Sequence, residues 1–174
     1  MKPAIVIGGC VLLLLRPALL RTGPPTLVIT ILFTVLLLAA LRVSIDRERQ
    51  LIDRRWLVVL AVGVAVFASG RVLGGGQAPA MLSARLVALN SLAAVAEEAF
   101  FRRVVYAVLA PVGAAYAVVG AASLFALVHV TVYGVWVLPI DLAAGLVFGW
   151  QRWATNSWSV PAATHVMANV LVVV

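Results

Sequence analysis

The chain has 174 residues, of which 64% are hydrophobic and only 11% are charged. Soluble domains contain about 45–50% apolar and about 25% charged residues, so this chain has too little polar surface for a water-soluble fold, and lipid must surround most of it. The formal net charge of +7 comes from basic residues at the ends of apolar runs and in one short loop, a pattern typical of membrane topology, and no nucleic-acid-binding module is recognisable.

Seven apolar segments follow one another along the chain, most of them near the roughly 17–25 residues that cross a bilayer as a helix. Gly, Pro and short polar stretches separate them. The expected segments are residues 4–20, 25–41, 56–73, 81–110, 112–130, 133–150 and 158–174. We therefore expect an all-α, polytopic transmembrane bundle of about seven helices, forming one domain over residues 1–174. Its N-terminal spans lie in residues 1–80 and its core helices in residues 81–174.

The polar loop at residues 42–55 (RVSIDRERQLIDRR) sets the expected orientation. It holds five arginines, and short loops rich in Lys and Arg stay on the cytoplasmic side. Alternating the segments outward from this loop places nine basic residues toward the cytoplasm and four toward the other side. The N-terminus is then predicted inside and the C-terminus outside.

Segment 81–110 contains the first candidate site residues. Ionisable side chains in the middle of a membrane helix cost at least about 2.5–3.5 kcal/mol, so those that occur there usually have a function. Glu98 and Arg102 are four residues apart and share one helix face, where they can form an ion pair. Glu97 is rotated by about 100° from Glu98 and has no partner in its own helix. A carboxylate in such a place binds its proton more tightly, as a general base near neutral pH requires.

The later segments add two histidines. Phe125 and His129 lie one turn apart in segment 112–130, and His165 and Asn169 lie one turn apart in segment 158–174. Asp141 follows Pro139, which is expected to break or kink segment 133–150. Each residue alone could be structural, since a buried Asn often bonds a neighbouring helix. Together, both histidines and two of the six acidic residues, Glu97 and Glu98, fall inside three spans of one half of the chain, which favours a functional site.

These residues form three motifs in order: Glu97-Glu98-x-x-x-Arg102, Phe125-x-x-x-His129 and His165-x-x-x-Asn169. Over residues 81–174 the chain resembles the CAAX protease and bacteriocin-processing (CPBP, or Abi) family of intramembrane endopeptidases, which includes the Ras-converting CAAX endopeptidases. The resemblance implies a bundle of eight or fewer helices around a catalytic cavity in the membrane, so that residues 81–174 would be the catalytic core.

The resemblance also implies a role for each motif residue. Glu97 and His129 would activate a water, His165 and Asn169 would stabilise the oxyanion, and Glu98 would pair with Arg102 and support the site together with Phe125. Arg103 departs from the pattern, because many members have Gly there.

No metal cofactor is favoured, because the Glu98–Arg102 pair competes with metal ligation by Glu98. In the alternative, a divalent metal such as zinc would be held by Glu97, His129 and His165.

The sequence thus predicts a bacterial, multi-pass protein of the inner (plasma) membrane that hydrolyses a peptide bond. Its partners would be the lipid bilayer and a membrane-anchored peptide or protein, such as a C-terminal sorting tail, and not nucleic acid. Bacterial origin is suggested by the use of arginine in place of lysine and by the many Ala, Gly and Val residues. One alternative is a non-enzymatic bacteriocin-immunity or scaffold protein. A second is a small transporter with a Glu/His proton relay, which would predict an internal repeat that the sequence lacks.

Overall fold

The computed structural model describes residues 2–45, 52–73 and 83–173, and all regular elements in these ranges are helical. This confirms the predicted all-α fold. Two parts of the predicted topology, residues 46–51 of the polar loop (with Arg47 and Arg49) and the Gly/Pro break at 74–79, lie outside the described residues. The elements are α1 (Lys2–Leu14), α2 (Arg16–Leu19), α3 (Pro25–Leu41), α4 (Arg54–Leu73), α5 (Ala84–Glu98), the π-helix η1 (Ala99–Val105), α6 (Tyr106–Leu109), α7 (Ala114–Tyr133), the 3-10 helix η2 (Val135–Val137), α8 (Leu138–Thr155) and α9 (Ser159–Val173).

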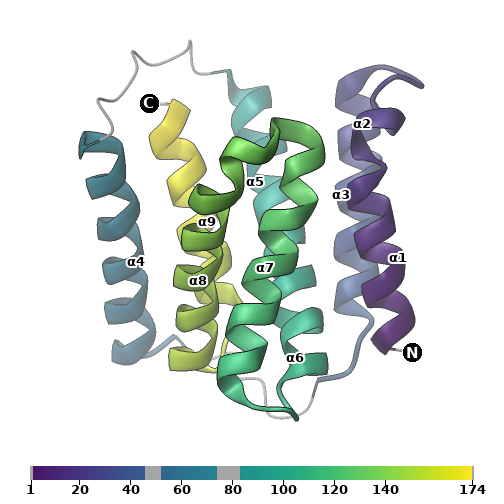
Figure 1. Cartoon of the computed structure of the whole chain (residues 1–174). Helices are drawn as coiled ribbons and strands as arrows, with labels where there is room; N and C mark the ends of the chain where they lie inside the picture. Colours follow the sequence, from purple (N-terminus) through teal and green to yellow (C-terminus); the bar gives the residue numbers. More distant parts are fainter. Residues whose placement is uncertain (1, 46–51, 74–82, 174) are drawn as a thin grey trace.

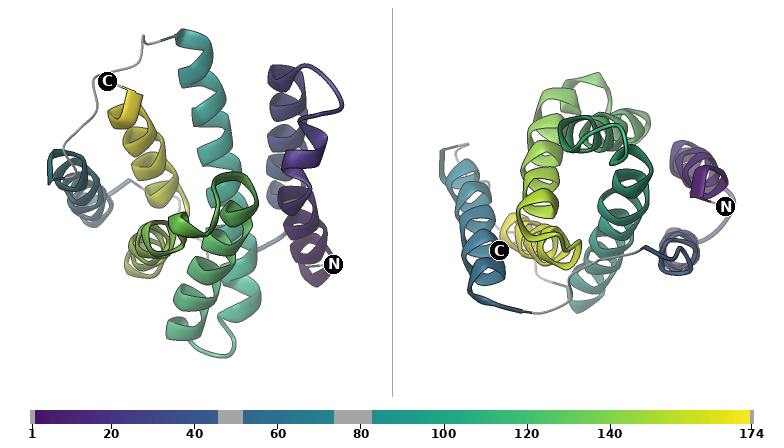
Figure 2. Two further views of the ribbon diagram at one scale, coloured as in Figure 1. Left: turned by 45° about the horizontal axis from the view of Figure 1, so that its top comes forward. Right: turned by 90° about the horizontal axis from the view of Figure 1, so that it is seen from below.

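The helices run alternately up and down, with α5, η1 and α6 together forming one long helix at the centre (Figure 1). This central helix packs against α3 on one side and against α7 and α9 on the other. Figure 2 shows α1 and α3 flanking one side of the bundle and α4 flanking the opposite side. The helices of the sequence motifs therefore lie inside the bundle, between these two outer layers.

Proline and glycine set several helix ends close to the predicted ones. Pro25 opens α3, and Pro139 lies in the first turn of α8, where its missing N–H costs no hydrogen bond. Segment 133–150 is thus broken close to Pro139, as predicted, because helix α8 begins there. Gly113 and Gly134 bound α7 with φ angles of 144° and 88°, which side chains with a Cβ rarely adopt.

The central helix contains a π-helical stretch that the sequence analysis did not predict. The N–H of Tyr106 bonds to the carbonyl of Phe101, five residues earlier. This stretch begins directly after Glu98, and it buries the consecutive side chains of Phe100, Phe101 and Arg102 completely. A regular α-helix packed on one face cannot bury three successive large side chains, but this helix is covered by neighbours on several sides. Wide turns of this kind are rare and occur often at functional sites.

Helix α4 is held to the bundle by a small polar contact. Only Val59 and Gly63 are buried in its 20 residues. The amide nitrogen Nε2 of Gln151 on α8 donates to the carbonyl of Val59 (3.0 Å) and to the hydroxyl of Thr164 on α9 (2.8 Å). Gly63 makes room for this amide, because a Cβ at position 63 would lie 2.1 Å from Nε2.

This contact predicts different effects of the same substitution at two glycines of α4. Gly63→Ala forces the Gln151 amide away from both acceptors, so we expect it to lower the free energy of unfolding by about 1–3 kcal/mol. Gly70→Ala meets nothing within 4 Å, and it should be neutral or slightly stabilising because Ala is the better helix former. Unfolding of both variants in mixed detergent micelles measures the difference, and equal shifts would contradict the role assigned to Gln151.

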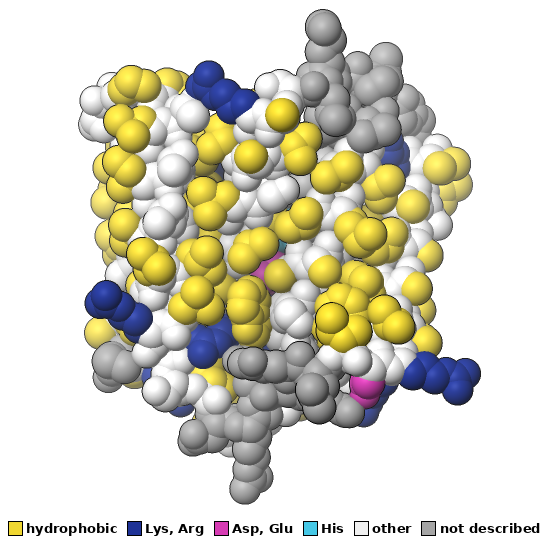
Figure 3. Space-filling view, turned by 180° about the vertical axis from the view of Figure 1, so that it is seen from behind, with side chains coloured by type: hydrophobic (Ala, Val, Ile, Leu, Met, Phe, Trp, Pro, Cys, Tyr) yellow, Lys and Arg dark blue, Asp and Glu magenta, His cyan; other side chains and the backbone are white. Residues whose placement is uncertain are grey.

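The outer surface is strongly apolar. Two described helices, α4 and α7, are long and apolar enough to cross a membrane. Large apolar side chains also lie exposed on other helices, including Ile7, Ile31 and Ile140. Figure 3 shows yellow apolar side chains over most of one face, with Lys and Arg in its upper and lower parts. A carboxylate and a histidine are visible between apolar side chains near the middle of that face.

Candidate active site

Glu98 links two of the three motifs. Its side chain is fully buried; Oε2 lies 3.1 Å from Nε of Arg102, and Oε1 lies 2.9 Å from Nδ1 of His165 on α9. The ion pair expected from the four-residue spacing is therefore present. The contact with His165 was not expected, since the sequence analysis did not pair His165 with Glu98. Because an ionised carboxylate accepts hydrogen bonds only, Nδ1 of His165 carries the proton in this contact.

Arg102 lies in an aromatic cage. Its guanidinium carbon is 4.7 Å from the ring centre of Phe125, 5.2 Å from that of Phe148 and 5.7 Å from that of Phe101. Its Nη2 donates to the carbonyl of Gly145 at 3.1 Å. The faces of aromatic rings attract cations, so the cage stabilises a buried charge that would otherwise need water. This gives the motif residue Phe125 a physical role as a wall of the cage.

Glu97 faces His129 across the helix interface. Oε1 of Glu97 lies 3.8 Å from Nε2 of His129, and the Glu97 side chain is nearly fully buried. Nδ1 of His129 donates to the carbonyl of Phe125 at 2.7 Å, so in the neutral ring Nε2 is the free acceptor. A separation of 3.8 Å exceeds a direct hydrogen bond, but a water placed about 2.8 Å from each atom would bridge the two.

Asp141 is a further acidic residue at this site, and the sequence analysis gave it no role. Its Oδ2 lies 3.9 Å from Nδ1 of His129. The ring of Tyr133, one turn after His129 on α7, stacks on the His129 ring at 5.9 Å and 9°. From the sequence, Asp141 could be identified only as an acidic residue inside a predicted span. That pattern does not indicate which residues its carboxylate contacts.

Phe148 is the second residue that the sequence did not reveal. Its ring stacks on His165 at 4.9 Å between ring centres and on Phe67 of α4 at 5.1 Å. It therefore connects the outer helix α4 to the site. In the sequence, a phenylalanine in an apolar span looks the same whether it packs on a site residue or only on other apolar side chains.

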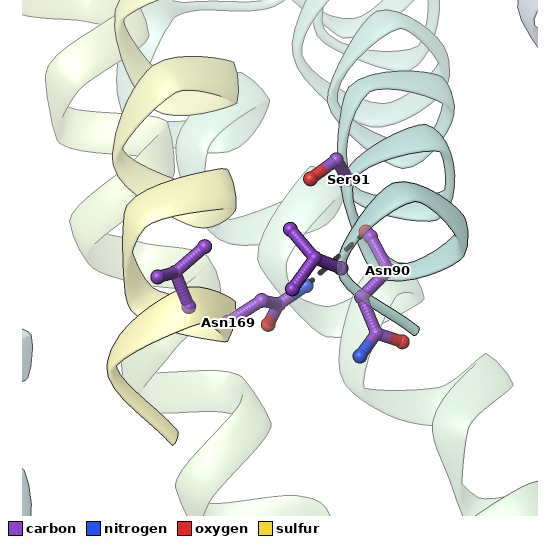
Figure 4. A pocket seen from close by; sticks show the side chains of 5 residues that line it. Asn90, Ser91 and Asn169 are labelled. Carbon is purple, nitrogen blue, oxygen red and sulfur yellow. Dashed lines mark hydrogen bonds between the residues drawn. The ribbon is translucent and has the colours of Figure 1, made fainter. Parts of the chain in front are cut away.

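Asn169 lies apart from the other motif residues. Its Nδ2 donates to the backbone carbonyl of Asn90 on α5 at 3.4 Å, and the two residues line a shallow pocket with Ser91 (Figure 4). Asn90 is nearly two helical turns before Glu97. Asn169 therefore contacts α5 nearly two turns away from Glu97 along the helix axis. The structure brings the other six sequence-predicted residues into one network of contacts: Glu97, Glu98, Arg102, Phe125, His129 and His165.

Two further arginines hold the π-helical stretch in place. Nη1 of Arg103 donates to the carbonyl of Ala40 at the end of α3, and Nε of Arg152 on α8 donates to the carbonyl of Arg102 at 2.9 Å. Arg103, the departure from the family pattern, therefore ties the central helix to α3.

The alternative metal ligands do not form a cluster. Within residues 2–45, 52–73 and 83–173, no three His, Cys, Asp or Glu side chains are grouped as ligands of one ion. Glu98 is bound through both oxygens to Arg102 and His165. The alternative zinc ligands Glu97, His129 and His165 are thus not grouped around one point in this part of the structure.

Comparison with known proteins gives one result. Residues 79–171, more than half of the chain, match the family model "Type II CAAX prenyl endopeptidase Rce1-like". No curated protein and no solved structure matches the chain. The matched range contains every residue of the contact network described above.

Proposed function

Since the chain belongs to the Rce1-like family of type II CAAX prenyl endopeptidases, a family of membrane-bound proteases, we propose that it hydrolyses a peptide bond within the membrane with a water activated by Glu97 and His129. The observation that supports this most directly is the 3.8 Å separation of Glu97 Oε1 from His129 Nε2. Both atoms accept hydrogen bonds, so they can orient the two O–H groups of one water.

The reaction then follows from the positions of these acceptors. Glu97 takes one proton as the water oxygen attacks the carbonyl carbon of the substrate, while His129 holds the other O–H at Nε2. The C–O bond forms and the carbonyl oxygen becomes an oxyanion. When the C–N bond breaks, the proton held by Glu97 passes to the leaving nitrogen, which restores the carboxylate.

His165 is the proposed main donor to the oxyanion. Its Nδ1–H is directed to Glu98, so the imidazolium form that this role requires would carry its second proton on Nε2 and could donate it to the substrate. The buried carboxylate of Glu98 stabilises the positive charge that this form carries. Asn169 joins as a second donor when its long 3.4 Å bond to Asn90 is exchanged for the oxyanion.

The Glu98–Arg102 pair supports the site and does not touch the substrate in this mechanism. Arg102 is completely buried and held by the aromatic cage and the Gly145 carbonyl. It fixes Glu98, and Glu98 in turn fixes the ring of His165. Such supporting contacts keep donors in the geometry that the transition state needs.

We further propose that the chain crosses the membrane several times. The support is the alternating course of the helices (Figure 1) and the apolar outer surface (Figure 3). The basic loop around residues 42–55 would face the cytoplasm, in the inner membrane of a bacterium. The substrate would then be a membrane-anchored peptide or protein, with a C-terminal sorting tail favoured over a prenylated one.

A cleavage assay tests this function. Purified protein in proteoliposomes is offered a farnesylated CAAX peptide and a transmembrane sorting-tail peptide, and new termini are identified by mass spectrometry. We expect cleavage of the sorting-tail peptide that persists with a chelator and falls at least about 100-fold in His129→Gln. Cleavage abolished by the chelator would contradict the metal-free mechanism. No cleavage of either peptide would contradict the protease and favour the immunity or scaffold protein.

A further inference from the structure

Asp141 has no part in the mechanism above, yet it lies inside the candidate active site. It is four residues before Gly145, in the first turn of α8. Its Oδ2 atom is buried and has no hydrogen-bond partner in the described part of the chain. Burying a carboxylate oxygen without such a partner is costly. Nδ1 of His129 lies 3.9 Å from this atom.

The His129 ring has a carboxylate at each of its two nitrogen atoms. Glu97 of α5 faces Nε2 at 3.8 Å, and Asp141 of α8 faces Nδ1 at 3.9 Å. Nδ1 also donates to the Phe125 carbonyl, and Tyr133 of the same helix stacks on the ring. The two carboxylates are not equivalent, because only the Nδ1 side already has a hydrogen bond that fixes the proton there.

We propose that Asp141 is a positioning residue for His129, whose carboxylate keeps the ring proton on Nδ1 and so leaves the lone pair of Nε2 directed at the attacking water. A carboxylate at one nitrogen of a catalytic histidine fixes the tautomer and makes the other nitrogen a better acceptor. Asp141 acts only through His129 and does not touch the substrate. The proposal rests on the proposed function, because it assigns His129 to water activation.

Kinetic measurements on Asp141→Asn are the first test. The substitution keeps the size of the side chain and removes its charge, so we expect kcat to fall about 10–100-fold, as for other residues that orient a catalytic histidine. KM should change by less than about threefold, because the interaction is not made with the substrate. Asp141→Glu should recover part of kcat. Asp53→Asn is the matched control: its carboxylate accepts the N–H of Trp56 at the start of the outer helix α4, and kcat should stay unchanged.

A double-mutant cycle separates positioning from a general structural effect. In the His129→Gln background, Asp141→Asn should lower kcat by less than about twofold, because the residue through which it acts has gone. A full additional 10–100-fold loss in this background would overturn the proposal. Wild-type kcat in Asp141→Asn itself would overturn it as well.

A spectroscopic measurement remains informative even if no substrate is cleaved. The chain has two histidines, so ring-15N-labelled protein in micelles gives two sets of ring resonances, which His165→Gln assigns. We expect Asp141→Asn to move the His129 resonances toward the Nε2–H tautomer, and Asp53→Asn to leave them in place. Unchanged His129 resonances in Asp141→Asn would overturn the proposal independently of the protease activity, whereas a shift without any cleavage by the wild type would contradict only the proposed function.

Discussion

Replacing Glu97 by Gln should abolish peptide hydrolysis while the protein stays folded. The amide is as large as the carboxylate but cannot accept a proton from the bridging water, so kcat should fall by about 10³-fold or more, within the range for a general base. Among the described residues Glu97 pairs with His129 and with no Arg or Lys side chain. The free energy of unfolding should therefore change little, by less than about 1 kcal/mol.

The measurement is single-turnover cleavage of the sorting-tail peptide by Glu97→Gln, with Asp53→Asn as the control for removal of a carboxylate elsewhere. Far-ultraviolet circular dichroism of the same samples checks that the helices are intact. Hydrolysis by Glu97→Gln within about tenfold of the wild type would assign water activation to another residue. The pattern of the Asp141 variants would then show whether the second carboxylate near His129 takes that role.

Replacing Arg102 by Met should destabilise the protein and inactivate it together. The change removes the one guanidinium in contact with Glu98 and leaves a buried carboxylate with His165 as its remaining described partner. Breaking a buried ion pair costs about 3–5 kcal/mol, and we expect the lower end because His165 still contacts Glu98. Arg102→Lys should not restore the protein, since an ammonium cannot fill the flat aromatic cage and reach the Gly145 carbonyl.

The double variant Glu98→Gln/Arg102→Met distinguishes an uncompensated charge from lost packing. With both charges removed, at least half of the stability lost in Arg102→Met should return, whereas activity should not, because His165 has lost its carboxylate. Unfolding in mixed micelles measures stability, and Arg85→Met, an exposed arginine of the same helix, is the matched control. A double variant as unstable as Arg102→Met would show that the cage packing, and not the charge pair, carries the effect.

The helices were predictable from the sequence because apolar length and Gly/Pro breaks act locally. In the described part of the chain, each of the seven expected segments corresponds to one or more helices, with ends displaced by a few residues. Helix α7, for example, continues to Tyr133 and ends at Gly134, past the expected end at Val130, because the glycine and not the end of the apolar run stops it. The Glu98–Arg102 pair was predictable for the same reason, since residues four apart on one helix must be neighbours.

Contacts between helices were less predictable. The sequence placed His165 beside Asn169, but their partners come from α5, which the spacing within α9 does not specify. The π-helical stretch could not be foreseen either, because it arises from burial of Phe100, Phe101 and Arg102 among several helices. Asp141 was visible as an acidic residue in an apolar span, yet only the packing of α8 on α7 shows that it meets His129. The catalytic roles themselves stay predictions.

The π-helical stretch also makes the number of residues in the central helix as important as their identity. Each residue of a π-helical turn rotates the chain about the helix axis by less than a residue of an α-helical turn does. The stretch from Ala99 to Val105 therefore sets the angle between the helix face that carries Glu97 and Glu98 and the face that follows Tyr106. Deleting one residue there would let the helix return to α-helical periodicity and rotate one half against the other. The segment should therefore accept apolar exchanges at Val104 or Val105 but not a change of length, and natural relatives of this protein should show no insertions or deletions between the glutamate pair and Tyr106.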